Sequence, residues 1–247
     1  MADLLQQLTT IFVPVDEDVA GHHRAIDLAE RLAASLGLAI ELVTVGEPAA
    51  PLTGSAAIIG AEGVIADLAG RPDVLVCMTS RGASSVGEML HGSVSSAVVR
   101  ALHHPVLIVG PHSDGALNGT ICAIAVDGSA EAEAIVPFAS ALALAIGLRP
   151  VLYQAGMVGS AVPHDAVESG YLHRLAESAV PGTLLDFETL HGTSAEDALI
   201  DLASHGDVAL LAMTTRSVTA LQRLLHGSVA ADVVRHATCP VLVQSIW

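Results

Sequence analysis

Two glycine–serine pairs occur in matching sequence contexts, and their residue types suit anion binding. Gly92-Ser93 lies in LHGSVSSAVVR (90–100), and Gly227-Ser228 lies in LHGSVAADVVR (225–235). Each pair precedes a segment with a helical pattern. A helix that begins there offers free backbone N–H groups, a hydroxyl and the positive end of the helix dipole. The pattern predicts an anion site that needs no lysine, although each pair is also compatible with an ordinary helix cap.

Two aspartates complete a candidate constellation. Asp16 and Asp127 each close an apolar, strand-like run, at 11–15 and 121–126. A carboxylate at the end of a strand is a natural acceptor for ribose hydroxyls, and it can equally cap the turn that follows. Two further runs, Thr79-Ser-Arg-Gly82 and Thr214-Thr-Arg-Ser217, follow later strand-like segments and are expected to be turns. Their arginines, Arg81 and Arg216, are candidates to bind phosphate.

Composition and charge exclude several other functions. The ten basic residues are all arginine, and the formal net charge is −16. Without lysine, the chain has no Walker-A loop and no residue for Schiff-base chemistry. Its acidic charge is also unfavourable for nucleic-acid binding, which depends on basic residues that neutralise phosphates. The sequence has no nucleophile elbow, HExxH or CxxC motif, so we expect no catalytic site, with slow ATPase activity left open. The adjacent histidines His22-His23 and His103-His104 do not predict a metal site.

The apolar content does not predict a membrane protein. Mean hydropathy is +0.60, but the apolar run Ala134–Leu148 is interrupted by Pro137 and is shorter than the ~20 residues of a spanning helix. The first ten residues do not resemble a signal peptide. The three cysteines, Cys77, Cys122 and Cys239, lie in or beside apolar runs and are expected to be core thiols. We therefore expect a cytoplasmic protein without membrane contact.

The elements that position these residues occur twice along the chain. A turn-rich stretch at 110–119 separates the copies, which predicts domains at 1–112 and 118–247. Gly92 follows Asp16 by 76 residues, whereas Gly227 follows Asp127 by 100 residues, so the first copy is short by about one helix. Each copy is expected to be an α/β unit with a mainly parallel sheet of about five strands between helices.

The expected elements follow from periodicity and from chain-breaking residues. In the second copy we predict strands at 121–126, 151–153, 184–190, 208–213 and 241–244, and helices at 131–146, 164–180, 194–204 and 229–236. In the first copy we predict strands at 12–15, 40–45, 74–78 and 106–109, with a further short strand at 56–59.

With these motifs in place, the chain resembles the universal stress proteins in their tandem two-domain form. Nucleotide-binding members carry Gly-x2-Gly-x9-Gly-(Ser/Thr) after the fourth strand. This sequence has Thr79-x2-Gly82-x9-Gly92-Ser93 and Thr214-x2-Ser217-x9-Gly227-Ser228. The resemblance implies a flavodoxin-like or adenine-nucleotide α-hydrolase-like fold for each copy. Thr79, Thr214 and Ser217 depart from the glycine pattern.

The resemblance also implies a set of nucleotide-binding residues. In the first copy these are Pro14, Val15, Asp16, Met78, Arg81, Gly82, Gly92, Ser93, Val94 and Ser95. In the second copy they are Ala125, Val126, Asp127, Met213, Arg216, Gly227, Ser228 and Val229. The aspartates would contact ribose, the Gly-Ser pairs would contact phosphates, and the strand residues would lie near the base.

The implied function is a stress-response switch that binds ATP or AMP, with Mg²⁺, in at least one copy. The alternatives are a nucleotide-free interaction module that serves an unidentified protein partner, and a hydrolase or ligase of the wider adenine-nucleotide group. Family dimers often pair their last strands antiparallel. In this chain 106–109 and 241–244 are expected to pair in that way, as a pseudo-dimer within one chain, and a homodimer is left open.

Overall fold

The structure is a computed structural model, which describes residues 5–15, 21–44, 63, 68, 71–80, 105–157, 165–216 and 229–246. Nine strands form one sheet in the order β2-β1-β3-β4-β9-β8-β5-β6-β7. The strands are β1 (Thr10–Val15), β2 (Ala39–Thr44), β3 (Val74–Thr79), β4 (Val106–Val109), β5 (Ile121–Val126), β6 (Arg149–Met157), β7 (Asp186–Gly192), β8 (Val208–Arg216) and β9 (Val241–Ile246). The helices are α2 (His22–Leu36), α5 (Ala130–Glu133), α6 (Val136–Ala145), α7 (Asp165–Ala179), α8 (Ala195–Ser204) and α10 (Val229–His236).

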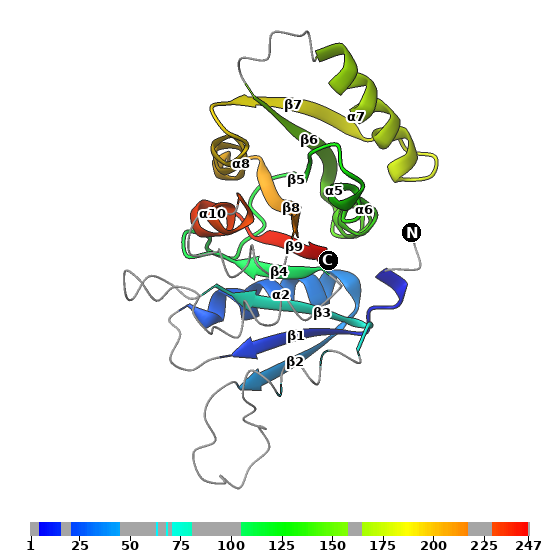
Figure 1. Cartoon of the computed structure of the whole chain (residues 1–247). Coiled ribbons are helices and arrows are strands. Elements are labelled where there is room, and N and C mark those ends of the chain that lie inside the picture. The colour runs from blue at the N-terminus through cyan, green and yellow to red at the C-terminus, as the bar shows by residue number, and fades with distance from the viewer. Residues whose placement is uncertain are drawn as a thin grey trace, which may run out of the picture.

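The sheet consists of two parallel groups joined by one antiparallel contact (Figure 1). The strands β2-β1-β3-β4 are mutually parallel, and so are β9-β8-β5-β6-β7. Between the groups, β4 and β9 run antiparallel with Leu107 opposite Leu242. The expected pairing of 106–109 with 241–244 is therefore present within the chain. Numbered within its own copy, the second group has the doubly wound order 3-2-1-4-5.

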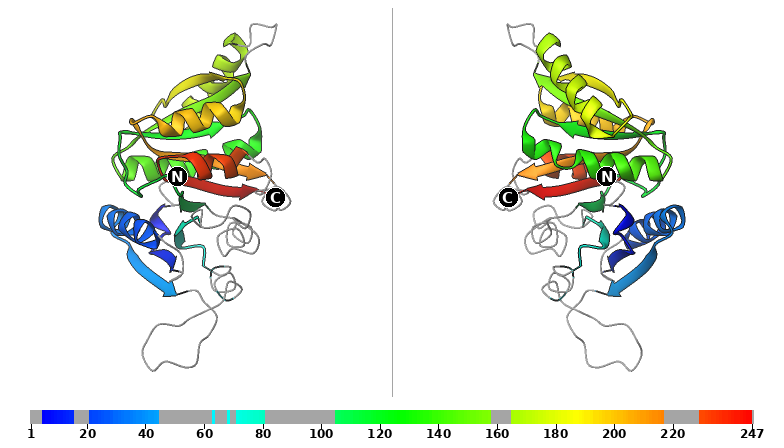
Figure 2. Two further views of the ribbon diagram at one scale, coloured as in Figure 1. Left: turned by 90° about the vertical axis from the view of Figure 1, so that its left-hand side faces the viewer. Right: turned by 90° about the vertical axis from the view of Figure 1, so that its right-hand side faces the viewer.

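Helices cover both faces of the sheet and divide its core in two. Alternate strand residues face opposite ways, so Ile124 belongs to the core cluster that contains residues of α2, α5, α6 and α7, whereas Ala123 belongs to the cluster that contains residues of α8 and α10. Figure 2 shows α8 and α10 over one face and α6 and α7 over the other. The buried strands consist of near-continuous apolar residues, as expected for a parallel sheet covered on both faces.

Most of the expected elements are present with ends within two residues of their predicted bounds, and three differ by more. The single helix predicted at 131–146 is two helices, because Pro137 lacks an N–H and occupies the first turn of a new helix, α6. The strand predicted at 208–213 continues to Arg216 as β8, alongside β9. The strand predicted at 151–153 extends over 149–157 as β6. The short strand predicted at 56–59 lies outside the described residues.

The outer strand of the first parallel group, β2, is partly exposed. Leu152 of β6 is fully buried in the core that contains Leu172 of α7. On β2, the strand that corresponds to β6, Ile40 and Leu42 are 37% and 54% exposed.

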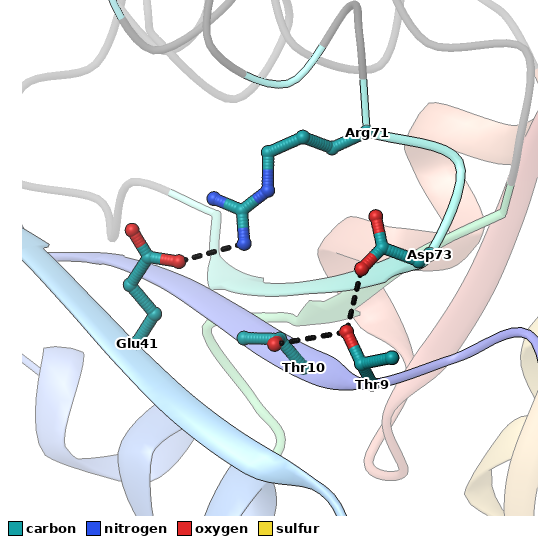
Figure 3. Close-up of polar contacts among 5 residues, drawn as sticks. All are labelled: Thr9, Thr10, Glu41, Arg71 and Asp73. Carbon is teal, nitrogen blue, oxygen red and sulfur yellow. Dashed lines mark hydrogen bonds and ion pairs between the residues drawn. The ribbon is translucent and has the colours of Figure 1, made fainter.

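A set of polar contacts ties the segment before β3 to β2 and to the start of β1 (Figure 3). Arg71 forms a 2.8 Å ion pair with Glu41, and the Thr9 hydroxyl donates to Asp73 at 2.5 Å. This hydrogen bond lowers the pKa of the Asp73 carboxyl. Thr9 and Asp73 immediately precede β1 and β3, so they lie at the opposite end of these strands from the candidate site.

Candidate functional site

The candidate site lies where the strand order reverses. In the second copy, β5 is flanked by β8 on one side and β6 on the other. The chain leaves β5 toward β6 and leaves β8 toward β9, so the two connections diverge at the carboxyl ends of β5 and β8. Ligands of doubly wound folds bind at such a point. In the first copy, β1 and β3 form the corresponding reversal.

Asp127 directly follows β5, and its carboxylate is fixed by Ser129. Its Oδ1 accepts hydrogen bonds from the Ser129 backbone N–H at 3.0 Å and from the Ser129 hydroxyl. The Ser129 Oγ in turn accepts from the Ala132 N–H at 3.1 Å and so caps α5. Gly128 has φ of 85°, a conformation that favours glycine. The carboxylate therefore takes part in capping the turn while it stays exposed at the end of the strand.

The apolar residues expected near a base lie side by side at the same place. Ile124 of β5 is in register with Ala212 of β8, so the next residues along, Ala125 and Met213, follow on adjacent strands. Both side chains are buried in the cluster that contains α8 and α10. Val126 faces the opposite way, into the cluster that contains α5, α6 and α7.

The carboxyl end of β8 differs from the expected turn. Thr214, Thr215 and Arg216 are strand residues in register with Gln244, Ser245 and Ile246 of β9. The prediction of a turn from Thr214 is therefore wrong. The cause is the length of β9, which provides a parallel partner as far as Ile246, together with the β-branched shape of threonine, which suits a strand. Thr79 likewise ends β3, in register with Val109 of β4.

The helix expected after Gly227-Ser228 is present as α10 and begins at Val229. Gly227 and Ser228 themselves lie outside the described residues. Asp232 in the first turn of α10 is largely buried and pairs with Arg235 of the same helix. The carboxylate of Asp232 is thus neutralised within α10.

Two polar residues beside Asp127 were missed at the sequence level. Gln154 of β6 is in register with Val126, and its Nε2 lies 3.9 Å from where a side chain on Gly128 would begin. Tyr171 of α7 also faces these acidic groups: burial and the neighbouring Glu133 and Asp127 carboxylates raise the pKa of its hydroxyl. No sequence motif indicated either residue, since both reach this position only through packing between elements.

The first copy contributes fewer described residues. Pro14 and Val15 lie at the carboxyl end of β1 and are partly buried, and Met78 near the end of β3 is buried. Pairing between β1 and β3 extends only from Thr10 to Phe12. The remaining predicted residues of this copy, Asp16, Arg81, Gly82, Gly92, Ser93, Val94 and Ser95, lie outside the described residues.

In the described parts of the chain, no group of three or more His, Cys, Asp or Glu side chains is arranged to hold a metal ion. None of the helices described is long and apolar enough to cross a bilayer. The described site thus consists of one oriented carboxylate, buried apolar side chains and a helix start, which together suit binding of a polar ligand that has an apolar part.

Comparison with known proteins assigns the family. The model of the universal stress protein family matches residues 121–244, from the first residue of β5 into β9. The chain belongs to the universal stress protein family. The match covers half of the chain and includes the Asp127 loop, the end of β8 and the start of α10.

The chain is similar to further proteins in sequence or in fold. A universal stress protein of Methanocaldococcus jannaschii is 39% identical over 62 residues, which is 25% of this chain and 36% of that relative's length. The crystal structure of a universal stress protein from Archaeoglobus fulgidus covers 96% of this chain and 98% of that chain, with 15% identity and a TM-score of 0.68. That likeness shows the fold over both copies. A universal stress protein crystallised in complex with cAMP covers 52% of this chain, with 23% identity and a TM-score of 0.43.

Proposed function

We propose that this universal stress protein binds an adenine nucleotide, ATP or AMP, in its second copy and acts as a regulatory switch in a stress response. The observation that carries the proposal is the position of Asp127. Its carboxylate follows β5 at the reversal of strand order, oriented by Ser129, with β8 as the neighbouring strand. This is where doubly wound proteins bind ligands.

We assign a group of the protein to each part of the nucleotide. Asp127 accepts hydrogen bonds from ribose hydroxyls, and the buried pair of Ala125 and Met213 provides the apolar side for the base. Phosphates lie toward the Gly227-Ser228 pair that immediately precedes α10, where the helix dipole favours negative charge. Bound Mg²⁺ would neutralise part of the phosphate charge in a chain whose net charge is −16.

We propose a binding role rather than a catalytic one, in a cytoplasmic protein built from units at 1–112 and 118–247. The sequence carries neither a lysine nor a recognised nucleophile motif. Nucleotide binding would then act by shifting the population of loop conformations at the site, which is how a ligand without chemistry operates a switch.

One observation favours a second candidate, a nucleotide-free module that binds a protein partner. Thr214 stands where nucleotide-binding members have a glycine, and it is part of the ladder between β8 and β9. A threonine held in a strand cannot provide the close backbone approach that a glycine loop gives to phosphate. In this case the second copy would keep the fold of the family without the ligand.

Calorimetric titration separates the two candidates. The full chain is titrated with ATP, ADP, AMP and cyclic AMP, with and without Mg²⁺. Asp127→Asn keeps an oxygen that can accept from Ser129 but removes the charge. We expect it to weaken binding by about 10- to 100-fold, because a hydrogen bond to a charged group contributes about 1.5–3 kcal/mol.

The matched control is Asp201→Ala, at an exposed position of α8, which is expected to leave the affinity unchanged. Absence of heat with all four nucleotides would refute the nucleotide proposal and favour the interaction module.

A further inference from the structure

The segment that joins the two copies, residues 110–119, contacts a helix of each copy. It runs from the end of β4 to the start of β5 and is called the strap below. One contact is with the first turn of α2, in the first copy. The other is with the last turn of α10, in the second copy. The strap therefore touches the helices that follow both candidate binding segments.

Arg24 makes the polar contacts between α2 and the strap that the structure describes. Arg24 donates through Nη1 to the carbonyl oxygens of Ser113 at 2.6 Å, Pro111 at 3.1 Å and Gly110 at 3.5 Å. The strap also packs on the backbone of the same residue, since a Cβ on Gly115 would lie 2.5 Å from the Arg24 carbonyl oxygen. The strap thus touches both the side chain and the main chain of Arg24.

The contact with α10 is made by the beginning of the strap. Gly110 packs so closely on α10 that a Cβ at this position would overlap the Val234 carbonyl oxygen. The ring of His112 stacks on that of His236, with centroids 6.3 Å apart and planes 10° apart. The His236 Nδ1 lies 2.8 Å from the Asp232 carbonyl oxygen, which holds the ring against its own helix.

Internal hydrogen bonds make the strap a fixed structure rather than a flexible linker. Ser113 is fully buried, and its Oγ accepts from the Gly115 N–H at 3.2 Å. Asp114 accepts from the Ala116 N–H at 2.8 Å and from the Asn118 side chain at 3.2 Å. When either helix is displaced, the strap is therefore expected to move as a unit rather than to change its own conformation.

We infer that the strap couples the two copies, with Arg24 as the positioning residue. Helix α2 begins six residues after Asp16, and α10 begins directly after Ser228. Through Arg24 and Gly110, a change at the start of either helix is transmitted to the other copy. For bound nucleotide this inference rests on the proposed function, and by linkage the coupling acts equally in both directions.

Hydrogen exchange read by mass spectrometry tests the coupling without any ligand. In the full chain, Arg24→Met removes the guanidinium while it keeps an unbranched apolar side chain. We expect amide exchange to rise about tenfold in the strap and in α10, because hydrogen bonds from a charged donor are lost. Arg24→Lys keeps a charged donor that can reach one carbonyl and is expected to restore part of the protection.

Arg31→Met is the matched control, because Arg31 lies on the exposed side of α2 and leaves the strap contacts intact. It is expected to change exchange in neither segment. Unaltered exchange of α10 in Arg24→Met would overturn the inference. So would equal effects of Arg24→Met and Arg31→Met.

A nucleotide experiment then extends the test to the ligand. In the wild-type chain, ATP bound in the second copy should slow exchange in residues 21–28 at the start of α2, and this effect should disappear in Arg24→Met. Protection confined to the second copy of the wild type would overturn the coupling while leaving nucleotide binding intact. No protection anywhere would refute nucleotide binding, and the ligand-free comparison still decides whether the strap couples the helices.

Discussion

Leu107 and Leu242 lie opposite each other in the antiparallel contact between β4 and β9. They are 1% and 0% exposed and belong to the same core cluster. Replacing either leucine by alanine leaves a cavity and is expected to reduce the free energy of unfolding by about 3 kcal/mol. Because the two truncations enlarge one shared cavity, the double variant should lose about 5 kcal/mol, less than the sum of the single losses.

Urea unfolding followed by circular dichroism measures these free energies, provided that each variant unfolds in a single transition. Leu152→Ala supplies the control, because Leu152 is equally buried but lies on β6, four strands from β4 and about 19 Å away. Combined with Leu107→Ala, it should be additive to within about 0.5 kcal/mol. Additivity in Leu107→Ala/Leu242→Ala as well would refute direct contact between these two side chains.

Three further predictions concern single side chains. Ser140 is fully buried in α6, and its hydroxyl has no hydrogen-bond partner among the described residues, so Ser140→Ala should raise the free energy of unfolding by about 1 kcal/mol in the same urea assay. A destabilised variant would contradict this. Burial raises the pKa of Cys77 and of Cys239 to about 12. Ellman's reagent at pH 8 should therefore react at least about a thousandfold more slowly with these two thiols in the folded chain than in guanidinium chloride. Rapid labelling of the folded chain would contradict this, because it would show that the thiols are accessible. A hydrogen bond from the Thr193 hydroxyl, and to a smaller extent one with Ser194, lowers the pKa of Asp197, so Thr193→Val should raise that pKa in an NMR titration. The stability that Asp197 contributes is present above its unfolded pKa and is lost as pH falls through the folded pKa. An unchanged pKa in the variant would contradict the assignment.

The elements of the second copy could be predicted from sequence because their signals are local. The strand at 121–126 and the helix at 229–236 have the bounds that periodicity gives. Pro137, which interrupts the apolar run, is also the residue around which the predicted helix divides, since proline suits a first turn. The end of β8 could not be placed in this way, because Thr214–Arg216 are strand residues only through pairing with β9.

The residues of the candidate site also differ in whether a local sequence signal could indicate them. Asp127 could be identified because an acidic residue directly after a buried strand is visible in the sequence, and the structure adds its contact with Ser129. Gln154 and Tyr171 could not, because they approach the Asp127 loop from β6 and α7. The contacts of Arg24 with the strap join residues 86 to 89 positions apart, and no local pattern encodes such a distance.

Photolabelling with 8-azido-ATP is the measurement that tests the central claim most directly, because the label marks the peptide that contacts the base. The full chain is irradiated with the probe, digested and analysed by mass spectrometry, with excess ATP as competitor. We predict that the label falls within residues 121–129 or 208–216, is displaced by ATP and is strongly reduced in Asp127→Asn. Labelling that ATP does not displace, or that falls on other peptides alone, would contradict a nucleotide site at the carboxyl ends of β5 and β8.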